Sequence, residues 1–253
     1  MPTPVKTVDK SEVERFAGNA AEWWNQRGPF ATLHQITPIR LAFLRQEMLR
    51  HFGGDPRSPR PFTGVSVVDI GCGGGLVAEP LARLGARVTG VDPGAENIAA
   101  AEVHARAQRL AIEYRAGTSH DLAAEGRQFD CVVALEVIEH VPDVDAFLES
   151  CAALARPGGL VLLSTLNRTA KAFALLIVGA EYVLRWLPRG THRWDRFVTP
   201  AEMDGALGRA GLSPVGQRGM VLTPLTGAWR LDDSDLDVNY FAAATKPGAA
   251  QSL

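Results

Sequence analysis

The stretch VSVVDIGCGGG, residues 65–75, is a short β-branched run that passes directly into a glycine-rich turn. Similar apolar runs recur at residues 86–92, 111–116, 129–135 and 159–165, with helical patterns at 76–84, 95–109 and 144–155 between them. This alternation predicts βαβ units and a doubly wound α/β fold with helices on both faces of the sheet. Two more runs, at 212–218 and 238–245, bring the expectation to seven mostly parallel strands.

Composition favours one soluble globular domain over residues 1–253, with 46% hydrophobic and 21% charged residues. The net charge of -2 gives no reason to expect a nucleic acid partner. The three cysteines fit neither a disulfide framework nor a zinc pattern, and no signal peptide is evident, so we expect a cytoplasmic protein. The longest apolar run, residues 172–180, is too short to span a bilayer.

Five segments are expected along the chain. Residues 9–50 are predicted to form extra N-terminal helices, and the Gly/Pro/Arg-rich residues 51–64 a loop. Residues 65–165 are predicted to form a cofactor-binding core, residues 171–193 a helical insert or lid after the fifth strand, and residues 196–245 the last part of the fold. In open sheets of this kind ligands bind beyond the carboxyl ends of the strands.

The glycine turn follows the pattern D-x-G-x-G-x-G. It begins at Asp69 and places its glycines at Gly71, Gly73 and Gly75. Leucine at position 76 breaks the dinucleotide fingerprint G-x-G-x-x-G, and the chain lacks GxxxxGK[ST], which excludes a P-loop. Asp92 ends the second strand, where a carboxylate can accept both hydroxyls of a ribose. The alternative is a glycine-rich turn without a ligand, followed by a helix-capping aspartate.

A second polar cluster follows the fourth strand, in ALEVIEHVPD, residues 134–143. Glu139 lies three residues and His140 four residues after Glu136, a spacing that places side chains on one face of a helical turn. Two carboxylates and an imidazole so close together shift one another's pKa unless a cation lies between them. Carboxylate oxygens suit a hard ion such as Mg²⁺. The alternative is that they cap a helix or line the cleft without a metal.

The D-x-G-x-G-x-G turn with its strand-end acid resembles class I S-adenosylmethionine-dependent methyltransferases. From about residue 12 to 245 the chain is similar to the O-methyltransferases of ubiquinone biosynthesis, which methylate polyprenyl catechols. The most specific matches are EVERFAGNAAEWWNQRGPFATLHQITPIRL and VGAEYVLRWLPRGTHRWDRFVTPAEM, while the loop at 51–64 is longer than that family's pattern. The resemblance implies a class I methyltransferase fold and two acceptors, an early polyprenyl catechol and the later demethylubiquinol.

The resemblance also implies where S-adenosylmethionine binds. Arg40 would reach the methionine carboxylate, and Thr118 and Ser119 would contact the adenine, although many family members carry an acid where this chain has Thr118. The full implied cofactor set is Arg40, Asp69, Gly71, Gly73, Gly75, Asp92, Thr118, Ser119 and Leu135.

The same comparison maps a divalent metal site, E-x-x-E-H, onto Glu136, Glu139 and His140. A bound Mg²⁺ there would chelate both oxygens of a catechol and lower the pKa of its hydroxyl. The E-H-V-P-D sequence also occurs in methyltransferases that use no metal. In the metal-free version His140 or Glu136 is the catalytic base.

Residues 171–189 combine large apolar side chains with basic residues at positions 171, 185 and 189. Such a helix fits a membrane surface, and a lid packed on the core is the alternative. We therefore expect a protein that binds peripherally to the inner membrane. Other ubiquinone-biosynthesis proteins are further candidate partners.

Two other functions fit parts of the sequence. One is a methyltransferase with another small acceptor, such as a C-methyltransferase of a different quinone. The other is a scaffold that binds S-adenosylmethionine without turnover. A nucleic acid methyltransferase is excluded because EVIE stands where an NPPY-like tetrad would lie, and there is no basic stripe.

Overall fold

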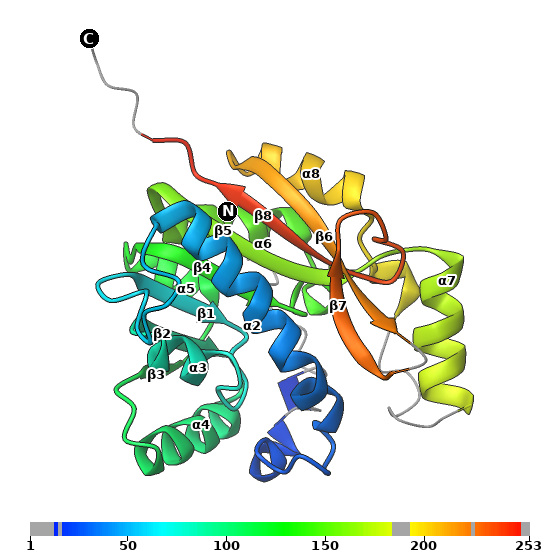
Figure 1. The fold of residues 1–253 in the computed structure, drawn as a ribbon, viewed down its shortest axis with the longest axis horizontal. Helices are drawn as coiled ribbons and strands as arrows, with labels where there is room; N and C mark the ends of the chain where they lie inside the picture. The colour runs from blue at the N-terminus through cyan, green and yellow to red at the C-terminus, as the bar shows by residue number, and fades with distance from the viewer. Residues whose placement is uncertain (1–12, 15–16, 184–192, 224–225, 249–253) are drawn as a thin grey trace, which may run out of the picture.

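The computed structural model describes residues 13–14, 17–183, 193–223 and 226–248. Within these residues one sheet has the strand order β3-β2-β1-β4-β5-β8-β6-β7 (Figure 1). Its strands are β1 Ser66–Ile70, β2 Arg87–Asp92, β3 Glu113–Ala116, β4 Phe129–Leu135, β5 Ala155–Leu166, β6 Ser213–Thr223, β7 Ala228–Asp232 and β8 Asn239–Thr245. All five strands predicted between residues 65 and 165 are present; β1, β4 and most of β5 are apolar runs that the sheet buries, whereas the edge strand β3 buries only Tyr114.

Strands β1 to β5 are parallel, and the order reverses between β1 and β4. Chain connections leave these two neighbouring strands in opposite directions, so a crevice opens at their carboxyl ends. Asp69 lies one residue before the end of β1, and Leu135 is the last residue of β4. The topology therefore brings the glycine turn and the acidic stretch to one edge of the sheet.

Helices cover both faces of the sheet. They are η1 Ala20–Glu22, α2 Ala31–Phe52, α3 Ala78–Arg83, α4 Ala95–Ala107, α5 Ser119–Ala124, η2 Ile138–His140, α6 Val144–Leu154, α7 Ala170–Ala172, η3 Phe173–Val183, η4 Trp194–Arg196 and α8 Pro200–Arg209. Buried side chains of α2, α3 and α4 share one core with the sheet, and those of α5, α6 and α8 share the other. Figure 1 shows α2 running across the sheet, in front of its central strands.

The sheet has one strand more than the predicted seven among the described residues. Strand β8 is antiparallel to β5, β6 is antiparallel to β8, and β7 adds an antiparallel edge strand to β6. The sequence analysis missed β7 because AWRLD is not a continuous apolar run. An edge strand needs no such run, since its side chains stay exposed or half-buried.

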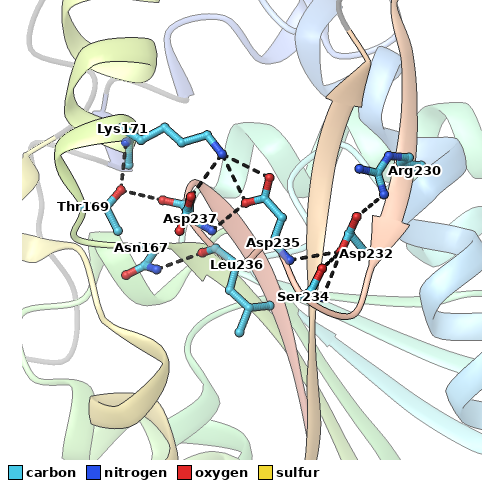
Figure 2. Close-up of polar contacts among 10 residues, drawn as sticks. Asn167, Thr169, Lys171, Arg230, Asp232, Ser234, Asp235, Leu236 and Asp237 are labelled. Carbon is cyan, nitrogen blue, oxygen red and sulfur yellow. Dashed lines mark hydrogen bonds and ion pairs between the residues drawn. The ribbon is translucent and has the colours of Figure 1, made fainter.

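The predicted insert begins as a helix between β5 and α8. Helix α7 continues without a break into η3, a π-helical stretch, while residues 184–192 lie outside the described part of the chain. Figure 2 shows how the loop before β8 holds the start of this helix. The Lys171 ammonium lies 3.1 Å from Oδ2 of Asp235 and 3.1 Å from Oδ2 of Asp237, and Thr169 Oγ1 donates to the Asp237 carbonyl. The base of the insert is thus tied to the sheet.

Candidate active site

The glycine turn is closely contacted by a side chain from the N-terminal segment. Gly73 has a φ of 50°, in the left-handed region, and a Cβ placed on it would lie 2.4 Å from Cη2 of Trp23. A Cβ on Gly74 would also lie 2.4 Å from Trp23 atoms. The turn therefore needs glycine both for its backbone conformation and for contact with an indole ring.

Asp92, at the end of β2, accepts three hydrogen bonds from its surroundings. The backbone N–H of Gly73 donates to Oδ2 at 3.0 Å, and the N–H of Gly94 donates to Oδ1 at 2.8 Å. Nδ2 of Asn97 also donates to Oδ1, at 3.0 Å. Burial raises the pKa of Asp92, and these three donors oppose that shift. A carboxylate offers about four lone-pair positions, so acceptor capacity remains on Oδ2.

Arg40 is buried in the middle of α2 and donates a hydrogen bond to Oε2 of Glu136. Burial lowers the pKa of Arg40 to about 10, while the charges of Asp69 and Glu139 oppose the shift. Nε of Arg40 is buried and has no hydrogen-bond partner among the described residues. A guanidinium that is buried, charged and incompletely bonded is suited to binding an anionic group.

Asp69 is the second buried group in this cluster with an unsatisfied atom. Its Oδ2 has no hydrogen-bond partner within the described part of the chain. The pKa of Asp69 is raised to about 7, chiefly by burial; the charge of Arg40 opposes this shift and that of Asp92 adds to it. The ends of β1 and β2 and the middle of α2 thus bring two carboxylates and one guanidinium together in a buried environment, where an unpaired charge is costly.

Glu136 follows the last residue of β4 and has a φ of 50°, which is rare for a residue with a side chain. Such strained conformations cluster at functional sites. Besides Arg40, its carboxylate accepts a hydrogen bond from Ser164 Oγ at 2.9 Å, and its own N–H donates to the same Oγ at 3.0 Å. Strand β5 and helix α2 therefore fix Glu136 from two sides.

The predicted metal ligands do not converge. Oε2 of buried Glu139 accepts a hydrogen bond from Thr165 Oγ1 at 2.9 Å, so Glu139 is engaged by β5, whereas Glu136 faces Arg40. His140 is half-buried at the end of η2. Across the described residues no group of three or more His, Cys, Asp or Glu side chains is arranged to hold a metal ion. This arrangement does not fit the three-ligand Mg²⁺ cage.

The two residues expected near an adenine have structural partners. Thr118 is the N-cap of α5 and forms a capping box with Asp121. Oγ of Ser119 accepts a hydrogen bond from Ser150 Oγ at 2.6 Å, which directs it toward α6. Leu135 is buried in the core at the tip of β4. For these three residues a cofactor contact stays a prediction.

Comparison with known proteins identifies the family. Residues 39–217 match a family model described as a methyltransferase domain. A ubiquinone biosynthesis O-methyltransferase of Azorhizobium caulinodans is 54% identical over 93% of this chain and 92% of its own length. One from Dinoroseobacter shibae is 50% identical over 98% of this chain and 100% of its own length. The chain belongs to the ubiquinone biosynthesis O-methyltransferase family. It is an S-adenosylmethionine-dependent O-methyltransferase, as predicted from the sequence.

Solved structures confirm the fold of this methyltransferase. The magnesium protoporphyrin IX methyltransferase of Synechocystis, with bound S-adenosylhomocysteine, superimposes with a TM-score of 0.66 at 20% identity, covering 94% of this chain and 100% of that one. The protein of a DhpI–SAM–HEP complex superimposes with a TM-score of 0.60 at 22% identity, covering 97% and 100%. At such identities the likeness establishes the class I fold alone.

Several residues of the methyltransferase that hydrogen-bond its predicted site residues were not predicted from the sequence. Asn97 donates to Asp92 and accepts from Trp23, while Ser164 donates to Glu136 and Thr165 to Glu139. The WW pair at 23–24 was used only as a family signature, and ST in GLVLLST only as the end of a strand. For Ser164 and Thr165 the available signal was their position at the end of a predicted strand, whereas for Trp23 no such signal existed.

Proposed function

We propose that the methyltransferase transfers a methyl group from S-adenosylmethionine to a hydroxyl of polyprenyl catechols, in both O-methylation steps of ubiquinone biosynthesis. The relatives' names support the pathway. The observation that carries the site assignment is the buried Arg40–Glu136 pair, which joins α2 to the tip of β4 beside Asp69. This pair places a cation and an oriented carboxylate together at the crevice of the sheet.

Arg40 and Asp92 are the groups that fit two polar parts of the cofactor, its methionine carboxylate and its ribose. The unsatisfied Nε of Arg40 gives a charge-assisted donor for a carboxylate, and Asp92 retains acceptor capacity for a ribose hydroxyl. When bound, S-adenosylmethionine supplies a methyl group already activated on a sulfonium. The protein must then orient the acceptor and remove its proton.

We propose Glu136 and His140 as the candidates for the residue that accepts the proton of the catechol hydroxyl. In the arrangement described, both oxygens of Glu136 already accept hydrogen bonds, from Arg40 and from Ser164. Imidazole is the most frequent general base in enzymes, and His140 lies at the end of the turn that follows β4. This favours His140 as the base, with Glu136 holding a catechol hydroxyl in position.

Substitution of each residue tests this assignment. His140→Ala should lower kcat roughly 100-fold or more, the usual contribution of general base catalysis, and Glu136→Gln should lower kcat because the catechol hydroxyl is less well oriented. The affinity for S-adenosylhomocysteine should stay within about threefold in both variants, because neither change removes a proposed cofactor contact. Wild-type kcat in both variants would refute the assignment.

The divalent metal predicted from the family is a separate question that the same assay answers. A cation bound by Glu136 would share its carboxylate with Arg40 and Ser164. Turnover that is abolished by EDTA and restored by Mg²⁺ would support the metal. Undiminished turnover in excess EDTA would establish the metal-free version.

The insert supports the predicted contact with a membrane surface. Phe173, Leu175, Val178 and Trp194 are 43%, 54%, 43% and 40% exposed, and the Phe173 and Trp194 rings meet edge-to-face at 6.3 Å. Lys171, expected to face anionic lipid, is instead engaged by Asp235 and Asp237 (Figure 2). We therefore propose that apolar contact, more than the charge of Lys171, carries docking. No helix among the described residues is long and apolar enough to cross a membrane.

A further inference from the structure

The adjacent residues Trp23 and Trp24 attach the N-terminal segment to the cofactor side of the sheet in two different ways. Trp23 is buried and stacks on Phe30, with ring centroids 3.8 Å apart and an interplanar angle of 2°. Its carbonyl lies 2.9 Å from Nε2 of His34. With Gly73 and Gly74 against the same indole, the ring has little freedom to move.

A chain of buried hydrogen bonds runs from Trp23 to Asp92. Nε1 of Trp23 donates to Oδ1 of Asn97 at 2.8 Å, and Nδ2 of Asn97 donates to Oδ1 of Asp92 at 3.0 Å. The three residues are 6%, 2% and 8% exposed, so little water competes for these bonds. Residues 23 and 92 are thereby coupled through one amide.

The chemistry of the indole fixes the direction of that chain. An indole nitrogen can only donate, so Asn97 must turn its oxygen toward Trp23. Its NH₂ group is then turned toward Asp92, where it donates to the carboxylate. Without the indole N–H the amide oxygen loses this donor, and one of the two hydrogen bonds that hold Asn97 against Asp92 is gone.

We infer that Trp23 is a positioning residue for the cofactor ribose, acting through Asn97 on Asp92. The inference rests on the proposed role of Asp92 as the acceptor of ribose hydroxyls. By orienting Asn97, Trp23 stabilises the ionised carboxylate and fixes the rotamer that presents the remaining acceptor position of Oδ2. The N-terminal segment thus contributes to cofactor recognition without a contact to the cofactor.

Trp24 supplies a matched control. Its Nε1 donates to the Gly74 carbonyl at 3.0 Å, and its ring stacks on His104 at 3.5 Å. Trp24→Phe removes one indole hydrogen bond to the glycine turn, as Trp23→Phe removes one to Asn97. Only Trp23→Phe breaks the chain of hydrogen bonds that leads to Asp92.

The test compares two ligands by calorimetry on the full chain: S-adenosylhomocysteine and its 2′,3′-dideoxy analogue. Trp23→Phe should weaken S-adenosylhomocysteine by roughly three- to tenfold, the value of one buried hydrogen bond, and leave the affinity for the dideoxy analogue unchanged. Trp24→Phe should change the affinities for the two ligands by the same factor. Equal losses for both ligands in Trp23→Phe would overturn the inference.

Two further variants separate the possible failures. Asn97→Ala should reproduce the ribose-specific loss, and adding Trp23→Phe to it should cause no further ribose-specific loss; this pair carries the test if Trp23→Phe alone does not fold. Asp92→Ala should bind both ligands with equal affinity. If Asp92→Ala still prefers the ribose hydroxyls, the proposed role of Asp92 fails. If Asp92 discriminates but neither Trp23→Phe nor Asn97→Ala does, only the inference fails.

Discussion

Replacing Arg40 by methionine tests the buried charge cluster most severely. Methionine keeps much of the length of the side chain and removes the cation that Asp69, Glu136 and Glu139 all interact with. Arg40 is only 4% exposed, so water cannot replace the lost charge. Removing one partner of a buried ion pair costs roughly 3–5 kcal/mol. For a chain of this size that corresponds to a fall in Tm of about 6–20 °C.

The loss in the Arg40→Met variant should depend on pH. Without the guanidinium the folded-state pKa of Asp69 rises further above its unfolded value, because Arg40 is what lowers it. Between the unfolded-state and the folded-state pKa of Asp69, the folded variant keeps a proton that the unfolded chain releases. The stability of the variant therefore falls as pH rises through that range. The stability gap to the wild type should therefore be larger at pH 8 than at pH 5, measured by urea unfolding.

The same variant tests the proposed contact with the methionine carboxylate. S-adenosylhomocysteine carries that carboxylate and 5′-methylthioadenosine does not. Arg40→Met should weaken the former by roughly 10- to 150-fold, the value of a hydrogen bond to a charged group, and the latter hardly at all. Arg45→Met, on the same helix and bonded only to the Pro56 carbonyl among the contacts described, is the control. Equal loss of both ligands in Arg40→Met would refute the reasoning.

Three further predictions concern other parts of the site and the insert. Because burial raises the pKa of Asp69 to about 7, the contribution of Asp69 to stability is lost as pH rises from about 4 to 7. Asp69→Asn should remove that part of the pH dependence of the unfolding free energy, measured with urea. An unchanged pH dependence would contradict this prediction. Ser164→Ala, which removes a hydroxyl bonded to Glu136, should lower kcat roughly three- to tenfold without weakening S-adenosylhomocysteine, and a change in Kd alone would argue against an orienting role. The double variant Phe173→Ser and Leu175→Ser should sediment less with vesicles containing anionic lipid than the control Val103→Ser, which changes an exposed residue of α4. Equal sedimentation of the two proteins would contradict membrane docking by the insert.

The glycine turn and its acid could be predicted from sequence because both are local. A continuous apolar run, a turn that needs glycine and an aspartate at the next strand end fix the place of Asp69 and Asp92 without any knowledge of tertiary contacts. The pairing of Arg40 with Glu136 spans 96 residues, and only the family resemblance pointed to Arg40. The Trp23–Asn97 contact, across 74 residues, had no sequence signal.

The metal site stays a prediction, but the helical geometry behind it differs from the structure. The prediction assumed that Glu136, Glu139 and His140 share one helical turn. The turn is a 3-10 helix of three residues, Ile138–His140, and Glu136 lies before it with a positive φ. Glu136 and Glu139 then bind different side chains of β5 and α2, which spacing along the chain cannot reveal.

The most direct measurement is methyl transfer to a synthetic short-chain prenyl catechol, followed by mass spectrometry of the product. The matched acceptor is the isomer whose two hydroxyls are meta to each other. We predict one O-methyl group on the catechol, stoichiometric S-adenosylhomocysteine, and at most slight transfer to the isomer. No transfer to the catechol, or equal transfer to both, would contradict the assignment of this crevice to an ortho-diol.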